Sequence, residues 1–121
     1  MNKILIVDDD TLLAETWRIG LNSAGFEVIT AITGNDGITQ TVNHKPDVVL
    51  LDQIMPDMSG NTVLSTLKQD PQTSAVPVIL ISNFNQPDVM MEAMRIGAVD
   101  YLLKYETEID HLIERIRTVL M

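Results

Sequence analysis

Cysteine is absent from this chain of 121 residues. Its absence excludes a disulfide framework, a thiolate metal site and a cysteine nucleophile, and it fits a reducing compartment. Long apolar runs are also missing, because none reaches the length that a membrane-spanning helix needs. We expect no signal peptide before Lys3. These absences together predict a cytoplasmic protein that does not enter a membrane.

Basic residues are few, with 8 Lys and Arg against 17 Asp and Glu and a formal net charge of −9. This charge repels nucleic acid, so we expect no direct nucleic-acid binding by this domain. A cation or a basic protein surface is the expected partner. Hydrophobic residues make up 45% of the chain, which is enough for one compact core. The length and the lack of repeats and linkers predict one domain over residues 1–121.

The stretch from residue 46 to residue 60 organises the rest of the chain. Residues 48–51 are all apolar, a pattern typical of a parallel strand that is buried on both faces, and Asp52 follows them directly. Pro56 and Gly60 then predict a loop. A strand that delivers one carboxylate to the rim of a sheet can present a reactive group there.

Short apolar strands alternate with helical patterns along the whole chain. We expect strands over residues 4–7, 26–32, 48–51, 77–81 and 99–103. We expect helices over residues 11–24, 35–43, 61–70, 87–96 and 107–120. This alternation predicts an α/β fold, a doubly wound (βα)5 domain with a five-stranded parallel sheet. Right-handed crossovers favour the strand order 2-1-3-4-5, which places a ligand site at the carboxyl ends of strands one and three.

Polar side chains follow four of these strands: Asp8, Asp9, Asp52, Ser82 and Lys104. Two carboxylates about 4 Å apart repel each other by roughly 4 kcal/mol at a near-surface dielectric. Three carboxylates therefore require a cation or raised pKa values. Mg²⁺ suits such a site because it takes carboxylate and phosphate oxygens. A carboxylate beside Mg²⁺ and a lysine can serve as a phosphoryl acceptor.

These residues fall into four motifs that resemble the receiver domain of two-component response regulators, of the chemotaxis-regulator type. The motifs are Ile-Leu-Ile-Val-Asp-Asp at 4–9, Asp-x-x-Met-Pro-x-Met-x-Gly at 52–60, Ser82 after a buried strand, and Gly-Ala-x-Asp-Tyr-Leu-x-Lys at 97–104. The resemblance covers the whole chain. It implies the flavodoxin-like receiver fold, whose strand order is the one expected above.

The resemblance also implies a role for each site residue. Asp52 is implied to be the phosphoacceptor, with Lys104 as the phosphate-contacting lysine. Ser82 and Tyr101 are implied to form the switch pair. The implied Mg²⁺ ligands are Asp8, Asp9, Asp52 and the backbone carbonyl of Ile54.

The implied function is a phosphorylation-activated signalling switch. A histidine kinase, a phosphotransfer protein or a small phosphodonor is expected to supply the phosphoryl group to Asp52 in a Mg²⁺-dependent reaction. The expected output is a changed affinity for an effector protein or domain through the face formed by the fourth helix, the fifth strand and the fifth helix. Such a domain is a monomer or a phosphorylation-linked dimer. It is no enzyme toward other substrates and catalyses only its own phosphorylation and dephosphorylation.

The sequence departs from the family pattern at two positions. Tyr105 stands where the family usually has a proline joined by a cis peptide, and we expect a trans bond here because a non-proline cis bond costs roughly 2.5–4 kcal/mol. Asn83 replaces a small residue. Ile54 and Phe84, which flank the path of a hydrolytic water by resemblance, are apolar, so we expect a long-lived phosphoryl-aspartate and faster phosphate release in Phe84→Ala.

Two other functions remain open at this stage. Residues 7–11 look partly like the Asp-x-Asp motif of haloacid-dehalogenase phosphohydrolases, which would make Asp8 a nucleophile, although the spacing of the expected Gly and Thr is wrong. A receiver-like scaffold that no longer takes phosphate is the other, and its support is Tyr105 and Asn83.

Several residues have simpler structural interpretations. Asp10 is expected to cap the first helix, and Trp17 is expected in the core. Core filling is expected to explain some of the three methionines on the fourth helix, and an adaptable docking surface beside Tyr101 is the alternative; the methionines are Met90, Met91 and Met94. The two histidines and Asp57, Asp70 and Asp88 are expected at the surface.

Overall fold

The computed structural model describes residues 1–83 and 85–121. Strands and helices alternate as the sequence predicts, and their ends differ from the expected ones by one or two residues at most positions. The strands are β1 (Lys3–Val7), β2 (Glu27–Ala31), β3 (Val48–Asp52), β4 (Val78–Ser82) and β5 (Asp100–Leu103). The helices are α1 (Thr11–Ser23), α2 (Gly34–His44), α3 (Gly60–Gln69), α4 (Pro87–Ile96) and α5 (Ile109–Leu120).

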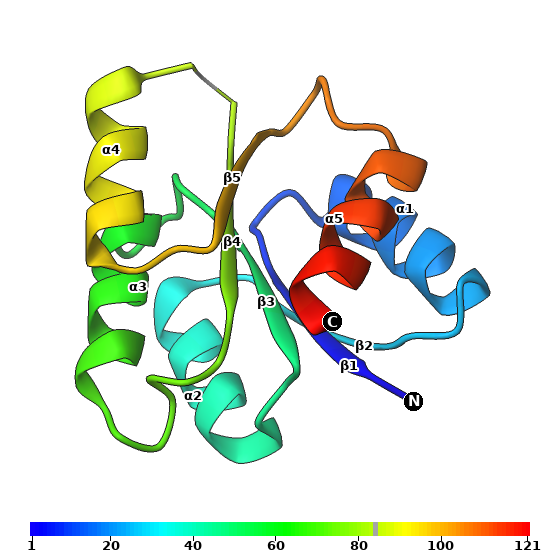
Figure 1. Ribbon diagram of the computed structural model, residues 1–121, viewed down its shortest axis with the longest axis horizontal. Helices are drawn as coiled ribbons and strands as arrows, with labels where there is room; N and C mark the ends of the chain where they lie inside the picture. The colour runs from blue at the N-terminus through cyan, green and yellow to red at the C-terminus, as the bar shows by residue number, and fades with distance from the viewer. Residues whose placement is uncertain (84) are drawn as a thin grey trace.

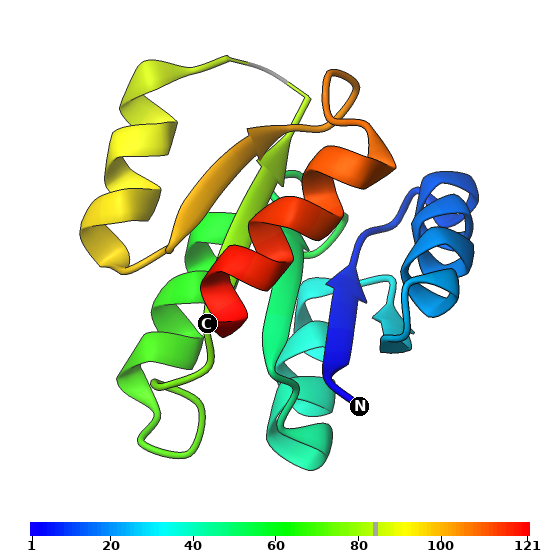
Figure 2. The ribbon, with the colours of Figure 1, turned by 45° about the vertical axis from the view of Figure 1, so that its right-hand side comes forward.

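All strand pairs are parallel, and the sheet has the order β2-β1-β3-β4-β5, which confirms the predicted topology. Helices α1 and α5 cover one face of the sheet, and α2, α3 and α4 cover the other (Figures 1 and 2). Because every strand runs in the same direction, the carboxyl ends of all five strands lie along one edge. In the register of the sheet, Asp52 pairs with Ile81 and Ser82 pairs with Leu103.

The three central strands bury both of their faces. Ile4 and Ile6 of β1 pack against the side of α1 and α5, while Leu5 and Val7 pack against the side of α2, α3 and α4. The four apolar residues of β3 are at most 1% exposed. Each such side chain contributes about 1.5–3 kcal/mol when it leaves water. This burial fixes the strands against one another and so fixes the edge at which they end.

Helix α1 shows the cap and the buried side chain that the sequence predicts. The Asp10 carboxylate accepts a hydrogen bond from the backbone N–H of Leu13, as an N-cap does. Trp17 is buried within the core on this side of the sheet. Gly25 follows the helix with a φ of 96°, a conformation that glycine adopts without steric cost.

Helix α4 contradicts the core interpretation of its methionines. Met91 is 67% exposed and Met94 is 45% exposed, and Met90 is only partly buried. The sheet-facing stripe consists instead of Ala93, which is fully buried, and Ile96, which packs against the core. The small Ala93 side chain lets the helix lie close to the sheet, so the longer methionine side chains extend from its flank.

Among the described residues, no helix combines the length and the apolar character that crossing a membrane requires. His44 and His111 are exposed, as expected.

Lys45 ends α2 in the left-handed conformation, with φ 46° and ψ 62°, and its side chain is exposed. A residue with a Cβ pays roughly 1–2 kcal/mol for this conformation, and glycine does not. Lys45→Gly should therefore stabilise the protein by about 0.5–1 kcal/mol after the entropic cost of glycine in the unfolded chain. Urea unfolding would measure this gain. Lys45→Ala, which removes the same charge and keeps the Cβ, should bring none, and an equal gain from both variants would contradict the explanation.

Candidate functional site

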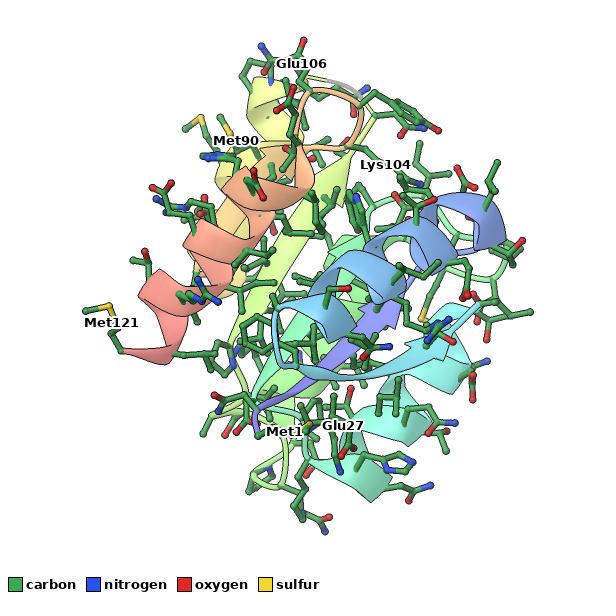
Figure 3. The ribbon with its side chains drawn as sticks, turned by 90° about the vertical axis from the view of Figure 1, so that its right-hand side faces the viewer. Met1, Glu27, Met90, Lys104, Glu106 and Met121 are labelled. Carbon is green, nitrogen blue, oxygen red and sulfur yellow. The ribbon has the colours of Figure 1, made fainter. Side chains whose placement is uncertain are left out.

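Four of the predicted site residues end strands at the carboxyl edge of the sheet and are buried there. Asp8, Asp52, Ser82 and Lys104 are all at most 5% exposed, whereas Asp9 is exposed. Lys104 lies at the opposite end of the sheet from Met1 (Figure 3). Asp52 and Ser82 are the last residues of β3 and β4, and Asp8 and Lys104 directly follow β1 and β5, so the parallel sheet brings them together.

Lys104 provides the positive charge of this cluster. Its Nζ lies 2.9 Å from both carboxylate oxygens of Asp8 and 3.5 Å from Oδ2 of Asp52. The backbone also holds these residues in place, because the N–H of Lys104 donates to the carbonyl of Ser82 at 2.7 Å. Asp8 is oriented further by the N–H of Asp10, which donates to its Oδ1 at 2.8 Å. Asp8 is therefore the most fully bonded carboxylate of the site.

Burial dominates the acidity of the two inner carboxyl groups. Desolvation, followed by the charge of Asp8, raises the pKa of Asp52 to about 6. Desolvation also raises the pKa of Asp8, although the hydrogen bond from Lys104 opposes it. Burial lowers the pKa of Lys104, but the hydrogen bond and charge of Asp8 outweigh it and leave the pKa above its ordinary value. The cluster is thus short of positive charge when both carboxylates are ionised.

Asp8, Asp9 and Asp52 each offer one carboxylate oxygen, and these oxygens all lie within 4.8 Å of one another. A set of hard oxygen ligands at this spacing, partly open to solvent through Asp9, fits a divalent cation such as Mg²⁺. Two of the three carboxylates are buried and share a single lysine, so a cation would also remove their repulsion. The residues therefore fit the metal that the sequence predicts.

The loop between β3 and α3 turns back sharply on the acceptor strand. Ile54 pairs with Ser59 in an isolated antiparallel bridge, and the N–H of Gly60 donates to the carbonyl of Gln53 at 2.7 Å. A Cβ at position 60 would lie 2.6 Å from the carbonyl oxygen of Asp52. Only glycine permits this close approach. These contacts close the loop and hold the backbone of Ile54, two residues after Asp52, at the edge of the site.

Asp57 fastens the same loop to α2. Its two carboxylate oxygens accept hydrogen bonds from the backbone N–H groups of Gly34 and Asn35, at 2.7 and 2.9 Å. These bonds lower the pKa of Asp57. Asp57 is exposed, as the sequence predicts, but it is an anchor for the loop as well as a surface residue.

Comparison with known proteins identifies the family of this chain. The family profile of the response regulator receiver domain matches residues 4–117. The chain belongs to this family.

Two curated relatives show how receiver domains of this kind occur. PilH of Pseudomonas aeruginosa is 38% identical over 120 residues, which cover 99% of this chain and 98% of PilH. The DNA-binding dual master transcriptional regulator RpaA of Synechocystis is 32% identical over 120 residues, which cover 99% of this chain and 49% of RpaA. The chain therefore spans nearly all of one relative and about half of the other.

Solved structures agree with the fold. A CheY-like response regulator receiver domain from Methanospirillum hungatei has a TM-score of 0.93 and 27% identity, with 99% of this chain and 94% of that chain covered. A response regulator from Chloroflexus aurantiacus has a TM-score of 0.91 and 30% identity, with 98% and 97% covered. The receiver fold expected from the sequence motifs is confirmed.

The residues that the sequence predicts to form the switch and its neighbouring loops occupy the following places. Tyr101 is partly buried on β5, and its hydroxyl is buried with no hydrogen-bond partner among the described residues. The peptide before Tyr105 is trans, as expected, and the Tyr105 hydroxyl donates to the Asp10 carboxylate at 3.3 Å. Ile54 is 55% exposed beside the site. Phe84 lies outside the described residues, so its shielding role stays a prediction.

Sequence analysis missed the polar residues that brace the site from behind. Gln53 is 6% exposed and exchanges hydrogen bonds with Asn61, and Asp57 binds α2. The sequence offers one signal for Gln53, which is a polar residue directly after an otherwise apolar strand. A buried amide at such a position requires a hydrogen-bond partner.

The raised pKa of Asp52 makes the stability of the metal-free protein depend on pH. The folded state keeps a proton up to about pH 6, whereas the unfolded chain loses it near 3.8. The free energy of unfolding should therefore fall as pH rises from about 4 to about 6, by at most about 3 kcal/mol. Asp52→Asn should remove much of this fall and be more stable than the wild type at pH 7.5 without metal. Urea unfolding of both proteins in EDTA, at about pH 4 and at pH 7.5, would measure these free energies of unfolding.

Glu114→Gln is the matched control, because it neutralises one exposed carboxylate on α5. It should leave the pH dependence as in the wild type. A metal-free Asp52→Asn protein less stable than the wild type at pH 7.5 would show that the Asp52 carboxylate is not strained in the folded state.

Proposed function

We propose that this receiver domain is a phosphorylation-activated switch in which Asp52 accepts a phosphoryl group in a Mg²⁺-dependent reaction. The observation that carries the proposal is the buried cluster of Asp8, Asp52 and Lys104, with one lysine shared by two carboxylates. Such a cluster is costly to bury unless a further cation or a ligand completes it. A phosphoryl group with a divalent cation would complete it.

The chain's own residues divide the work of phosphoryl transfer. An oxygen of Asp52 attacks the phosphorus of a phosphohistidine, the P–N bond breaks, and the leaving imidazole takes up a proton. Lys104, 3.5 Å from Asp52, is placed to contact the transferred phosphoryl oxygens. Asp8, Asp9, Asp52 and the carbonyl of Ile54 would hold Mg²⁺, whose charge would neutralise the same oxygens.

Asp52 suits the acceptor role better than Asp8 does. Both oxygens of Asp8 lie 2.9 Å from Lys104, and its Oδ1 also accepts the N–H of Asp10. Within residues 1–83 and 85–121, the Asp52 carboxylate has only the longer contact to Lys104. This difference disfavours the phosphohydrolase alternative with an Asp8 nucleophile. The retained acid cluster and lysine disfavour the scaffold alternative.

The output of the switch would pass through Ser82 and Tyr101. The Ser82 side chain ends β4 beside Asp52 and could move toward a new phosphoryl group. Tyr101 lines a groove of about 350 Å³ with Met90, Met91 and Met94, on the face of α4 and β5. Rotation of Tyr101 would reshape this groove, which an effector protein or domain would then recognise. A phosphorylation-linked dimer through the same face fits the same logic.

Partners follow from the family. The phosphodonor would be a histidine kinase or a phosphotransfer protein, and the domain would act in the cytoplasm without an enzymatic activity toward other substrates. The name of RpaA describes a DNA-binding transcriptional regulator, whereas this chain covers 98% of PilH. With its net charge of −9, this domain would act on protein partners and leave DNA contacts to another domain.

Phosphorylation can be tested directly by intact-mass analysis after incubation with acetyl phosphate and Mg²⁺. We expect one added phosphoryl group in the wild type, and none in Asp52→Asn or in the presence of EDTA. Asp47→Asn, which alters another carboxylate beside β3, should still be modified. An adduct that survives in Asp52→Asn and disappears in Asp8→Asn would overturn the assignment in favour of the phosphohydrolase.

The unpartnered hydroxyl of Tyr101 gives a second test. A buried hydroxyl without a hydrogen bond costs about 1–3 kcal/mol of desolvation, so Tyr101→Phe should leave the unphosphorylated protein equally stable or stabilise it by up to about 1 kcal/mol. Thermal and urea unfolding would measure the change. Tyr105→Phe removes an exposed hydroxyl that donates to Asp10, and it should change stability by less than about 0.5 kcal/mol. A clear loss in Tyr101→Phe would mean that the hydroxyl is hydrogen-bonded in the resting state.

A further inference from the structure

We propose that the side-chain amides of Gln53 and Asn61 link the acceptor strand to helix α4, and that this link positions the first turn of α4 according to the state of the Asp52 site. The proposal rests on the proposed phosphorylation of Asp52. It describes a path to α4 that runs behind the site, through α3, and does not use Ser82 or Tyr101.

The first part of the link is a closed pair of hydrogen bonds. Gln53 directly follows Asp52, and its Oε1 accepts the backbone N–H of Asn61 at 2.7 Å. Its Nε2 donates to Oδ1 of Asn61 at 3.0 Å. Gln53 is 6% exposed, so water cannot readily replace these bonds. The carboxyl end of β3 is thereby fixed to the first turn of α3.

The backbone around this pair leaves little freedom. Gln53 donates its N–H to the carbonyl of Ile81 at 3.0 Å and accepts the N–H of Gly60 at 2.7 Å. A Cβ at Gly60 would lie 2.6 Å from the carbonyl oxygen of Asp52 and 2.8 Å from Oε1 of Gln53. A displacement of the Asp52 backbone would therefore be transmitted to the start of α3.

The second part of the link joins α3 to α4, which contact each other on the same face of the sheet (Figures 1 and 2). Nδ2 of Asn61 donates to the backbone carbonyl of Val89 at 3.3 Å. The two ends of the Asn61 amide thus serve two different elements, with the oxygen bonded to Gln53 and the nitrogen bonded to α4.

The amino end of α4 has few other restraints. Gln86 occupies the N-cap position and makes no side-chain capping bond, and residues 85–88 are exposed. The methionines of this helix form one side of the groove that Tyr101 also lines. A single side-chain bond from α3 can therefore determine where this end of the helix rests. By thermodynamic reciprocity, a link that reports the Asp52 site to α4 must also let α4 influence binding at that site.

Asn61→Asp isolates the proposed link. The aspartate keeps an oxygen for Nε2 of Gln53 and the backbone N–H for Oε1, but it has no donor for the Val89 carbonyl. Asn61→Leu, of similar size, removes both side-chain bonds and serves as a second variant. Gln69→Met is the matched control, because Gln69 is an exposed residue of the same helix and, among the described residues, its amide bonds only to Ser65.

The measurement is amide hydrogen exchange of residues 89–96, with and without Mg²⁺ and beryllofluoride, and binding is followed separately by the ¹⁹F signal of bound beryllofluoride. In the metal-free protein, both Asn61 variants should exchange these amides about 2- to 10-fold faster, the effect of one lost hydrogen bond. Amides of α2 and the Gln69→Met control should keep wild-type rates. On beryllofluoride binding, the change in α4 exchange should be at least several-fold smaller in both variants than in the wild type.

Two results would overturn the inference, and they differ from a failure of the proposed function. A bound ¹⁹F signal together with the wild-type α4 response in Asn61→Asp would remove the link and leave the switch intact. No bound signal in the wild type would defeat the proposed function instead. In that case unchanged α4 exchange in metal-free Asn61→Asp would refute the link as well. Faster exchange confined to α4 would support the hydrogen-bonded link but overturn its dependence on the Asp52 site.

Discussion

A lysine ammonium shared by two buried carboxylates is the interaction on which the carboxyl edge of this sheet depends. Lys104 contacts both oxygens of Asp8 and one of Asp52, so β1, β3 and the segment after β5 meet at a single charge. Removing Lys104 would leave two buried carboxylates without their shared positive charge, and loss of a buried ion-pair partner costs about 3–5 kcal/mol. The three segments are therefore held together by electrostatics at one end and by apolar packing along their length.

The charges of this arrangement do not balance, because one ammonium lies near two buried carboxylates and the exposed Asp9. Burial and the nearby charge of Asp8 together raise the pKa of Asp52. Added positive charge relieves this imbalance, whereas a phosphoryl group on Asp52 would add negative charge and would therefore need a divalent cation together with Lys104. Stability of the metal-free protein and affinity for a cation thus oppose each other at this site. The repulsion between the carboxylates that destabilises the metal-free protein is the same interaction that would favour cation binding.

The fold was predictable because apolar runs such as residues 48–51 and 78–81 leave few alternatives once right-handed crossovers are assumed. The clustering of Asp8, Asp52 and Lys104 was predictable for the same reason, since parallel strands end together. The side of α4 that faces the sheet was not predictable, because Ala93 and Met94 are adjacent apolar residues and the sequence does not show which of them faces the core. The close packing of the helix on the sheet favours the smaller side chain of Ala93. Pairs that form through loop closure, such as Gln53 with Asn61, depend on a turn geometry that local pattern does not encode.

Helix α4 is the element on which the two proposed routes from the acceptor strand would converge. One would run along β4 and β5 through Ser82 and Tyr101, and the other would run behind the sheet through Gln53 and Asn61. A helix with no side-chain cap at its amino end and a largely solvent-exposed first turn has low local stability, so small changes in free energy can move it. The proposed link through Asn61 would act on the first turn of α4, whereas Tyr101 lies beside the methionines further along the helix. The exposed Met91 and Met94 lie further along the same helix, so a shift at its start would change the surface that they present.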